Sequence, residues 1–166
     1  MRYYECYDSP QGQMLLVADG ERLSGVYFDG QKYVAHIAPG WRRDACHPPL
    51  RQAKRELTEY FGGERKRFEV AIAPEGTPFQ RSVWKAISSV GFGETITYGE
   101  LADRAGCPGS ARAAGAATGR NPIGVIVPCH RIVGANGRLT GYAGGLDKKR
   151  ALLAFESQNP ELFSTA

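Results

Sequence analysis

The sequence predicts an α+β protein in which the strands come first and the helices follow. In residues 1–76, short aromatic and aliphatic runs alternate with turn residues, which indicates a β-meander. In residues 77–166, apolar residues recur with helical spacing behind capping residues. We therefore expect a small N-terminal α/β structural domain over 1–76 and a mainly helical domain over 77–166.

The first part is expected to hold four strands and one helix. Turn residues at 8–12 and 19–20 separate the early strands. A helix over 50–61 is indicated by apolar residues three and four apart, and Gly62-Gly63 ends it. The strands are expected at 3–7, 14–18, 23–28 and 68–72, and residues 29–49 are expected to form a loop.

The second part is expected to contain four helices. Thr77-Pro78 begins the first, and Thr97 with Glu100 has the spacing of a capping box for the second. Ser110 is placed to cap a third helix over 110–118. The last helix, 147–156, is expected to bury Ala151, Leu152 and Phe155, and residues 157–166 are expected to form a loose tail.

Composition favours a soluble protein of one or two small domains. The chain has 166 residues, 42% of them hydrophobic and 23% charged. No apolar run approaches the roughly 18 residues of a membrane span, and the N-terminus lacks the apolar core of a signal peptide. We expect a cytoplasmic protein, or a nuclear one if the source has a nucleus, with no membrane partner.

The four cysteines predict neither a disulfide framework nor a metal site. Cys6, Cys46, Cys107 and Cys129 show no paired spacing, and in the cytosol they are expected to be reduced. Zinc could be imagined on Cys6 and Cys46 with two histidines, but no CxxC or HxxxH spacing supports it. We therefore expect no metal and no cofactor.

The positive charge is concentrated in the second part of the chain. Residues 1–76 carry 11 basic and 11 acidic residues, so the whole net charge of +4 lies beyond them. Between Arg104 and Arg150, Asp147 is the only acidic residue. This distribution is compatible with a polyanionic partner, although a solvated basic face would also explain it.

A cysteine lies between two buried apolar runs at the centre of the second part. Residues 125–127 and 132–133 are β-branched and flank Pro128-Cys129-His130-Arg131. A base-capable imidazole and a guanidinium near a thiol favour the thiolate, the nucleophilic form. From the residues alone, a reactive Cys129 and a simple core cysteine remain open alternatives.

The two central helices have the pattern of a helix-turn-helix over about 97–119. A short turn containing glycine, 106–109, joins them. The second helix carries Arg112 near its start and otherwise mostly Ala, Gly and Thr, without the Asn or Gln that reads bases. If it binds DNA, we expect contact that is largely independent of sequence.

The order of these motifs closely resembles the O6-alkylguanine-DNA alkyltransferases. The resemblance spans about residues 77–156 and depends most on Ile126-Val-Pro-Cys-His-Arg-Ile-Val133, the family fingerprint, with Asn121-Pro122 before it and Gly141-Tyr-Ala-Gly-Gly145 after it. It implies a ribonuclease-H-like N-terminal part and a DNA-repair methyltransferase. The alkyl group would pass from O6-alkylguanine in double-stranded DNA, with O4-alkylthymine a further candidate, irreversibly to Cys129.

The resemblance also implies a catalytic set. Cys129 would be the nucleophile, His130 the base acting through a water, and Glu156 the residue that orients His130. Tyr98 would assist the leaving guanine and rotate the target phosphate. Asn121 would tie the helix-turn-helix to the active-site turn at 128–131.

The DNA contacts are implied in the same way. Arg112 would fill the gap left by the flipped base, as a finger in the minor groove. The other DNA-binding residues expected on this basis are Tyr98, Ser110, Ala113 and Thr118. The base pocket is expected to contain Ile132, Tyr142, Ala143 and Gly124.

Two of these positions depart from some family members. Gly124 replaces a proline and Ala143 replaces a serine, so we hypothesise a pocket that accepts groups bulkier than methyl. We expect a monomer in solution that acts once per molecule and could cooperate along DNA. The alternatives are a helix-turn-helix or lesion-recognition protein without chemistry and a cysteine hydrolase.

Overall fold

The computed structural model describes residues 1–157, which form two compact units. The first unit contains Met1–Glu75 together with Pro122–Ile126, and the second contains Gly76–Asn121 and the chain from Val127 on. This division differs from a single boundary at residue 76, because residues 122–126 pair with the first unit: Val26 N donates to Pro122 O (2.9 Å), and Gly124 N donates to Val26 O (3.0 Å).

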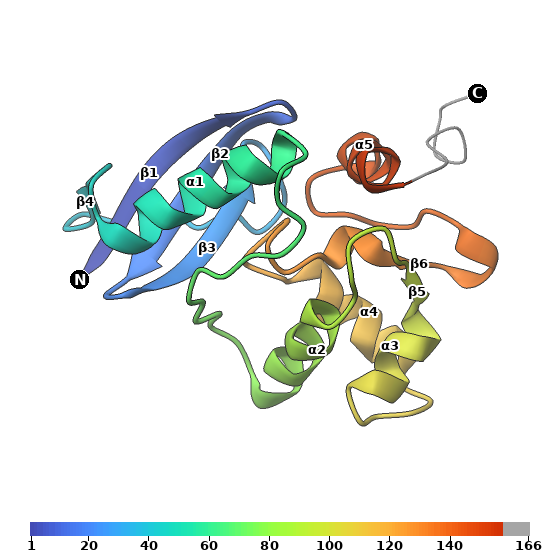
Figure 1. Cartoon of the computed structure of the whole chain (residues 1–166). Coiled ribbons are helices and arrows are strands. Elements are labelled where there is room, and N and C mark those ends of the chain that lie inside the picture. Colours follow the sequence, from blue (N-terminus) through green and yellow to red (C-terminus); the bar gives the residue numbers. More distant parts are fainter. Residues whose placement is uncertain (158–166) are drawn as a thin grey trace. The chain divides into compact units, whose positions relative to one another are not determined.

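The first unit is built on a four-stranded sheet of order β3-β2-β1-β4 (Figure 1). The first three strands are antiparallel neighbours and β4 lies parallel to β1. Gly12 adopts a φ of 111° where the chain turns from β1 into β2, a conformation that favours glycine. The strands are β1 (Arg2–Ser9), β2 (Gly12–Asp19), β3 (Arg22–Phe28) and β4 (Arg42–Arg43).

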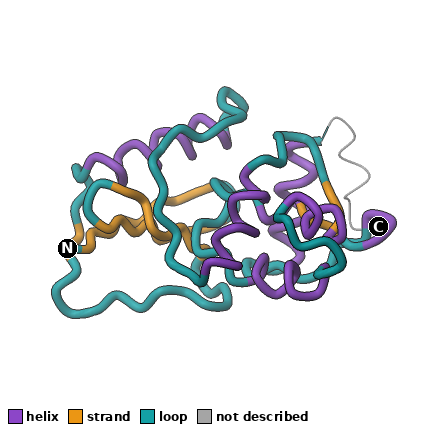
Figure 2. Tube along the Cα trace, turned by 90° about the horizontal axis from the view of Figure 1, so that it is seen from below, coloured by secondary structure: helices purple, strands orange, loops and turns teal. Residues whose placement is uncertain are grey.

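One helix, α1 (Pro48–Phe61), packs on this sheet. Figure 2 shows it running beside the strands. Leu50, Ala53, Leu57 and Tyr60 recur at helical spacing and are buried, which confirms the amphipathic helix expected here. Two prolines occupy its first positions, where a missing N–H costs no helical hydrogen bond.

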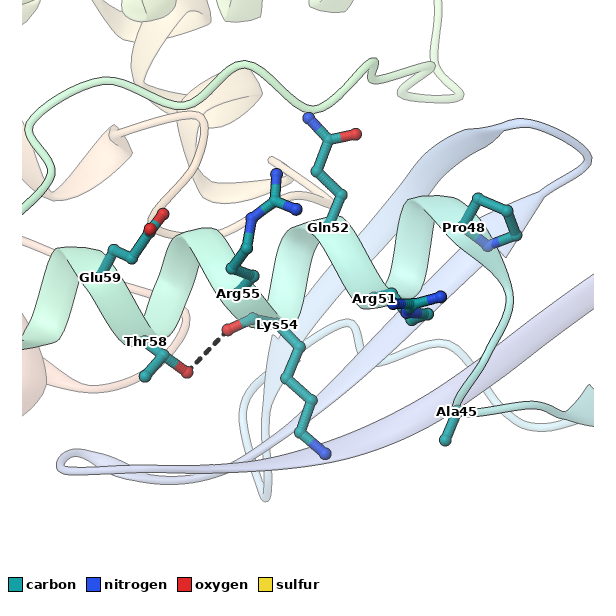
Figure 3. A pocket seen from close by; sticks show the side chains of 8 residues that line it. All are labelled: Ala45, Pro48, Arg51, Gln52, Lys54, Arg55, Thr58 and Glu59. Atoms are coloured by element: carbon teal, nitrogen blue, oxygen red, sulfur yellow. Dashed lines mark hydrogen bonds between the residues drawn. The ribbon is translucent and has the colours of Figure 1, made fainter.

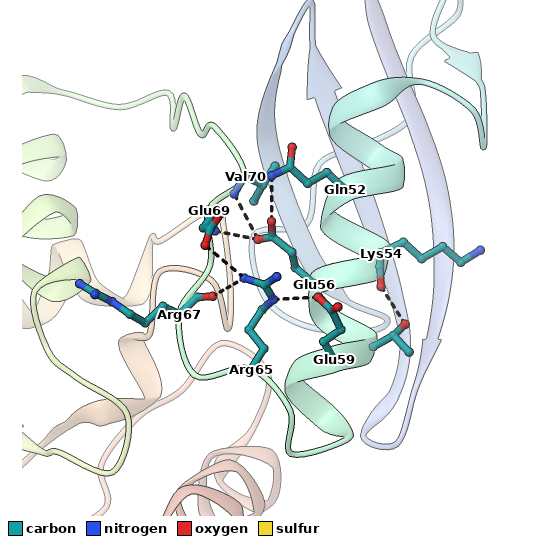
Figure 4. A network of polar contacts seen from close by, with 9 residues as sticks. Gln52, Lys54, Glu56, Glu59, Arg65, Arg67, Glu69 and Val70 are labelled. Atoms are coloured by element: carbon teal, nitrogen blue, oxygen red, sulfur yellow. Dashed lines mark hydrogen bonds and ion pairs between the residues drawn. The ribbon is translucent and has the colours of Figure 1, made fainter.

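The strand expected at 68–72 is absent. Only an isolated bridge joins Ile72 to Leu23. The backbone N–H groups of Glu69 and Val70 donate instead to the carboxylate of Glu56, at 2.8 and 3.1 Å (Figure 4). At residues 69–70 a buried side chain of α1 therefore takes the place of a neighbouring strand, whereas Ala71 O accepts from Leu23 N of β3 (2.9 Å).

The second unit contains four helices of the described chain: α2 (Pro78–Ser88), α3 (Tyr98–Arg104), α4 (Ala111–Gly119) and α5 (Leu146–Glu156). Capping boxes begin α2 and α3: Thr77 accepts from Gln80 N (3.1 Å), and Thr97 accepts from Glu100 N (3.2 Å). Trp84 is buried and donates from Nε1 to Ala117 O (2.8 Å), joining α2 to α4.

Ser110 lies at the N-cap of α4 but makes no capping hydrogen bond. Its backbone has φ −102° and ψ 39°, whereas Thr77 and Thr97 are extended. The extended conformation is the one that brings a capping oxygen to the free N–H groups, which explains the difference.

The apolar run before Cys129 belongs to the core and is not a strand. Residues 125–127 have no strand pairing, Val125 has a φ of 68°, and Val125 and Val127 are buried. The short strand β6 (Ile132–Val133) pairs in parallel with β5 (Ile96–Thr97), which the sequence did not predict. Such two-residue pairings leave too short a pattern to be detected by alternation.

The buried face of α5 is also different from the expected one. Phe155 is 40% exposed, whereas Lys149, Leu152, Leu153 and Glu156 are buried. Two charged side chains on a buried face need polar partners, and both find them in the site described below. Among residues 1–157, no helix is long and apolar enough to cross a membrane.

Candidate active site

Cys129 begins a single 3-10 turn, Cys129–Arg131, directly before β6. Pro128 breaks the apolar run, and the turn is held by bonds from Cys129 N to Val127 O (2.8 Å) and from Arg131 N to Pro128 O (2.9 Å). Only 8% of Cys129 is exposed. The turn expected at 128–131 is present, and it places the thiol in a buried environment.

His130 is fully buried and has one occupied ring nitrogen. Its Nε2 lies 2.8 Å from Oε2 of Glu156, the last residue of α5. Its Nδ1 is buried without a hydrogen-bond partner among the described residues. The sequence places these two side chains 26 residues apart, and the fold of the second unit brings them together.

Arg131 also binds Glu156. Its Nε and Nη2 donate to the two carboxylate oxygens at 2.8 and 2.9 Å, and its Nη1 donates to Val90 O at 2.7 Å. Its guanidinium lies 5.9 Å from the ring centroid of Phe92. Arg131 is thus committed to Glu156, which corrects the expectation that it favours the thiolate.

These contacts fix the charge states of the pair. Glu156 is buried, which raises its pKa, but bonds from His130 and Arg131 outweigh burial and lower the pKa to about 2. Burial lowers the pKa of His130 although Glu156 opposes that shift. At neutral pH the carboxylate is ionised and the imidazole is neutral. Because Nε2 faces a carboxylate, it carries the proton and Nδ1 is left as the acceptor.

Lys149 is a functional candidate that the sequence reasoning missed. It is fully buried and its Nζ donates to Ile132 O (2.6 Å), Thr140 O (2.8 Å) and Gly141 O (3.4 Å). Burial lowers its pKa to about 8, and attraction to Cys129 opposes that shift. Its spacing of seven residues from Glu156, on the same helix face, was the signal available in the sequence.

The thiol of Cys129 experiences opposing influences. Burial raises its pKa, while hydrogen bonding with the Asn121 side chain and the charge of Lys149 lower it. Asn121 is itself buried, and its Nδ2 donates to Val127 O (2.9 Å). The cation that favours the thiolate is therefore Lys149, and Asn121 links the end of α4 to the residues before Cys129.

Tyr98 is the first residue of α3, and its hydroxyl interacts electrostatically with Cys129. Its Oη accepts from Thr140 Oγ1 at 3.3 Å, so its own O–H remains available to donate. Burial is the largest cause that raises its pKa. The phenol therefore stays protonated at neutral pH.

The expected DNA-binding residues differ in how much of each side chain is exposed to solvent. Arg112 and Ala113 are exposed on the first turn of α4, and Ser110 is half-buried at its N-cap. Thr118 is buried and its Oγ1 donates to Ala114 O within the helix at 2.7 Å. We therefore withdraw Thr118 as a DNA contact, because its hydroxyl is already used by its own helix.

The expected pocket residues lie in different places. Ile132 is buried and its backbone is engaged: its N–H donates to Cys129 O and its carbonyl accepts from Lys149. A guanine edge could use only the second lone pair of that carbonyl. Tyr142 and Ala143 are half-buried in the second unit, whereas Gly124 belongs to the first. No group of three or more His, Cys, Asp or Glu in residues 1–157 could hold a metal ion.

Comparison with known proteins gives the same family over both parts of the chain. Residues 2–74 match the ribonuclease-like domain of 6-O-methylguanine DNA methyltransferase, and residues 78–158 match its DNA binding domain. A methylated-DNA–protein-cysteine methyltransferase of Methanosarcina acetivorans is 49% identical over 154 residues, which are 93% of this chain and 97% of that protein. One of Mycobacterium tuberculosis is 45% identical, with 94% and 93% covered.

Solved structures agree. The crystal structure of Mycobacterium tuberculosis O6-methylguanine methyltransferase has a TM-score of 0.83 at 42% identity and covers 99% of this chain and 100% of that one. Another, of Mycobacterium tuberculosis OGT in complex with DNA, has a TM-score of 0.84 at 41% identity and covers 99% and 96%.

These matches confirm the α+β fold with a ribonuclease-like first part and a helical DNA-binding second part. They also confirm the expected activity, DNA repair by methyl transfer to a cysteine of the protein. The chain belongs to the O6-methylguanine DNA methyltransferase family.

Proposed function

We propose that Cys129 is the acceptor and that it takes one alkyl group from O6-alkylguanine in double-stranded DNA. The observation that carries this proposal is the buried array of Cys129, neutral His130 and ionised Glu156, in which His130 Nδ1 has no partner among the described residues. A buried acceptor of this kind needs a donor, and a water between Nδ1 and the thiol would supply it.

The reaction begins with proton transfer from the Cys129 thiol through that water to His130. Glu156 holds the ring in the required tautomer and stabilises the imidazolium, while Lys149 stabilises the thiolate. The sulfur then attacks the alkyl carbon. The carbon–sulfur bond forms as the carbon–oxygen bond to guanine breaks.

The leaving guanine keeps the electron pair of the broken bond. Tyr98 donates a hydrogen bond to this oxygen as charge develops, since Thr140 occupies only an acceptor position of its hydroxyl. The guanine then gains a proton, which the imidazolium can return. The thioether has no chemical route back to a thiol in the site, so the protein works once per molecule.

The target oxygen takes part in base pairing, so the base must leave the duplex. Arg112 is the residue we assign to fill the resulting gap, and the exposure of its side chain supports that role. Ser110, Ala113 and Tyr98 would contact the DNA backbone beside it. Small side chains on α4 permit close approach of the helix to a groove.

Tyr142, Ala143 and Ile132 would form the base pocket, with Gly124 a further candidate. The smaller Ala143, in place of serine, supports acceptance of groups bulkier than methyl, and O4-alkylthymine remains a second candidate substrate. Replacing Gly124 by proline would also remove its bond to Val26 O, so Ala143→Ser is the cleaner test. We further propose that the protein is a monomer in solution, that it is located in the cytoplasm or nucleus, and that several molecules bind cooperatively along DNA.

Intact-mass measurement after incubation with methylguanine duplex DNA tests the chemistry. We expect one added methyl per molecule, mapped to Cys129, and none in Cys129→Ser. Cys46→Ser is the matched control, because Cys46 is exposed and lies in the first unit. Repeated turnover, or methyl transfer by Cys129→Ser, would contradict the proposal. A lesion-binding protein without chemistry would bind this DNA and gain no mass.

A further inference from the structure

The outer side of α1 carries a group of cations around a hollow of about 550 Å³. Arg51, Lys54 and Arg55 are all exposed and line it, and we refer to these three residues as the basic face. Figure 3 shows them spread over successive turns of the helix, with Pro48 at the helix start. The opposite side of α1 is its buried side, which is apolar except for Glu56.

Two carboxylates near these cations, one in the lining of the hollow and one that interacts with Lys54, are already paired with other residues. Glu59, the one carboxylate in the lining, forms an ion pair with Arg65 (Nε to Oε1, 2.9 Å), so its charge is compensated. Burial raises the pKa of Glu5, but hydrogen bonds and the charges of Arg43 and Lys54 lower it overall, and its ion pair is with Arg43, at 2.9 Å. The basic face therefore has an excess of positive charge, although residues 1–76 as a whole are neutral.

The placement of these cations is unfavourable for an isolated helix. Arg51 and Arg55 are four residues apart, and like charges at that spacing on a helix repel each other. Arg51 also lies near the N-terminus of α1, where the helix dipole disfavours cations, and the first turn has no acidic residue. A bound anion would relieve both costs.

We propose that the basic face binds the phosphate backbone of double-stranded DNA as a surface separate from the helix-turn-helix. Its long, flexible cations suit a row of phosphates, and the hollow is lined by charged and polar side chains for the most part. DNA is the substrate of the family, so this polyanion is present whenever the protein acts. The binding is independent of sequence and of the chemistry at Cys129.

The test is the salt dependence of binding to undamaged duplex DNA. The full chain with Arg51→Gln, Lys54→Gln and Arg55→Gln is compared with the wild type. The slope of log affinity against log salt should become shallower by about 0.9 for each phosphate that the variant no longer neutralises, or roughly 2 to 3 in total. Affinity at low salt should fall about tenfold or more, while methyl transfer at saturating DNA stays unchanged.

A matched control removes the same charge elsewhere. Arg22→Gln, Lys32→Gln and Arg67→Gln replace three exposed cations of the first unit that do not line the hollow. The control should retain most of the wild-type slope. Equal slopes for the two triple variants would overturn the proposal, because the effect would then come from net charge alone. Since undamaged DNA is used, failure of methyl transfer would not affect this result.

Discussion

Glu56 in the first unit and Glu156 in the second are both buried carboxylates, and they are held in opposite ways. Glu56 accepts from neutral donors: Gln52 Nε2 and the backbone N–H groups of Glu69 and Val70. Glu156 accepts from Arg131 and His130, of which one is always charged and the other titratable.

The difference teaches what each carboxylate can do. Neutral donors satisfy Glu56 without giving it a partner whose proton could move, so it fixes residues 69–70 to α1. Glu156 has a permanent cation on one side, which keeps it ionised, and an imidazole on the other, which it orients. The same side chain is thus structural in one unit and connected to a reactive thiol in the other.

Replacing each carboxylate by its amide should give the largest difference between Glu56 and Glu156 in the rate of methyl transfer. We expect Glu156→Gln to slow methyl transfer by about 100-fold or more, because His130 loses the partner that fixes its tautomer. Glu56→Gln should leave the rate unchanged and lower stability by about 1–3 kcal/mol through lost hydrogen bonds. The measurement is the single-turnover rate of each variant on methylguanine DNA, at a temperature below the melting transitions of both variants.

Glu156→Gln also leaves Arg131 buried without its counter-charge, which could unfold the second unit. Glu156→Asp keeps the charge and provides a second variant. Partial recovery of rate in Glu156→Asp would support an orienting carboxylate. If the rate of Glu56→Gln were as low as that of Glu156→Gln, the conclusion that only Glu156 acts on the reaction would be wrong.

Acid should reveal the contribution of the ionised Glu156 to the free energy of unfolding. The pKa of Glu156 is depressed in the folded protein to about 2, so its contribution to stability is present above the unfolded value of about 4.5 and is lost as pH falls towards 2. That contribution is on the order of 3 kcal/mol. Chemical denaturation at several pH values should show a steeper acid loss in the wild type than in Glu156→Gln, and parallel curves would contradict it.

Much of this site was accessible from the sequence, but the partners of its charges were not. The run around Cys129 and its His, the capping box of Thr97 and Glu100, and the helix-turn-helix are local patterns, and local patterns carry their own physical signal. That Arg131 binds Glu156, and that Lys149 takes its place near the thiol, depends on how α5 packs. Residues 68–72 illustrate the same limit: their alternation is real, but the N–H groups of Glu69 and Val70 donate to the side chain of Glu56 and only Ala71 bonds to the backbone of β3.

Lys149→Met is expected to slow the reaction less than Glu156→Gln does, with a decrease in rate of about tenfold at neutral pH. The variant removes the cation that lowers the pKa of Cys129, and it leaves the carbonyls of Ile132 and Thr140 without their donor. Because the pKa of Lys149 is about 8, the wild type itself loses this charge above that pH. The ratio of wild-type to variant rate should therefore be largest below pH 8 and decline above it.

The rate of alkylation at Cys129 by a small electrophile measures this ratio, with the Cys129 peptide quantified by mass so that exposed Cys46 does not contribute. Lys148→Met is the control, since the adjacent residue carries the same charge and is half-buried instead of enclosed. A ratio that stays constant from pH 6 to pH 10 would mean that Lys149 only holds residues 140–141 in place. A ratio that falls through its pKa would identify the charge itself as the cause, and the reactive unit would then depend on two buried ionic groups from one helix face, seven residues apart.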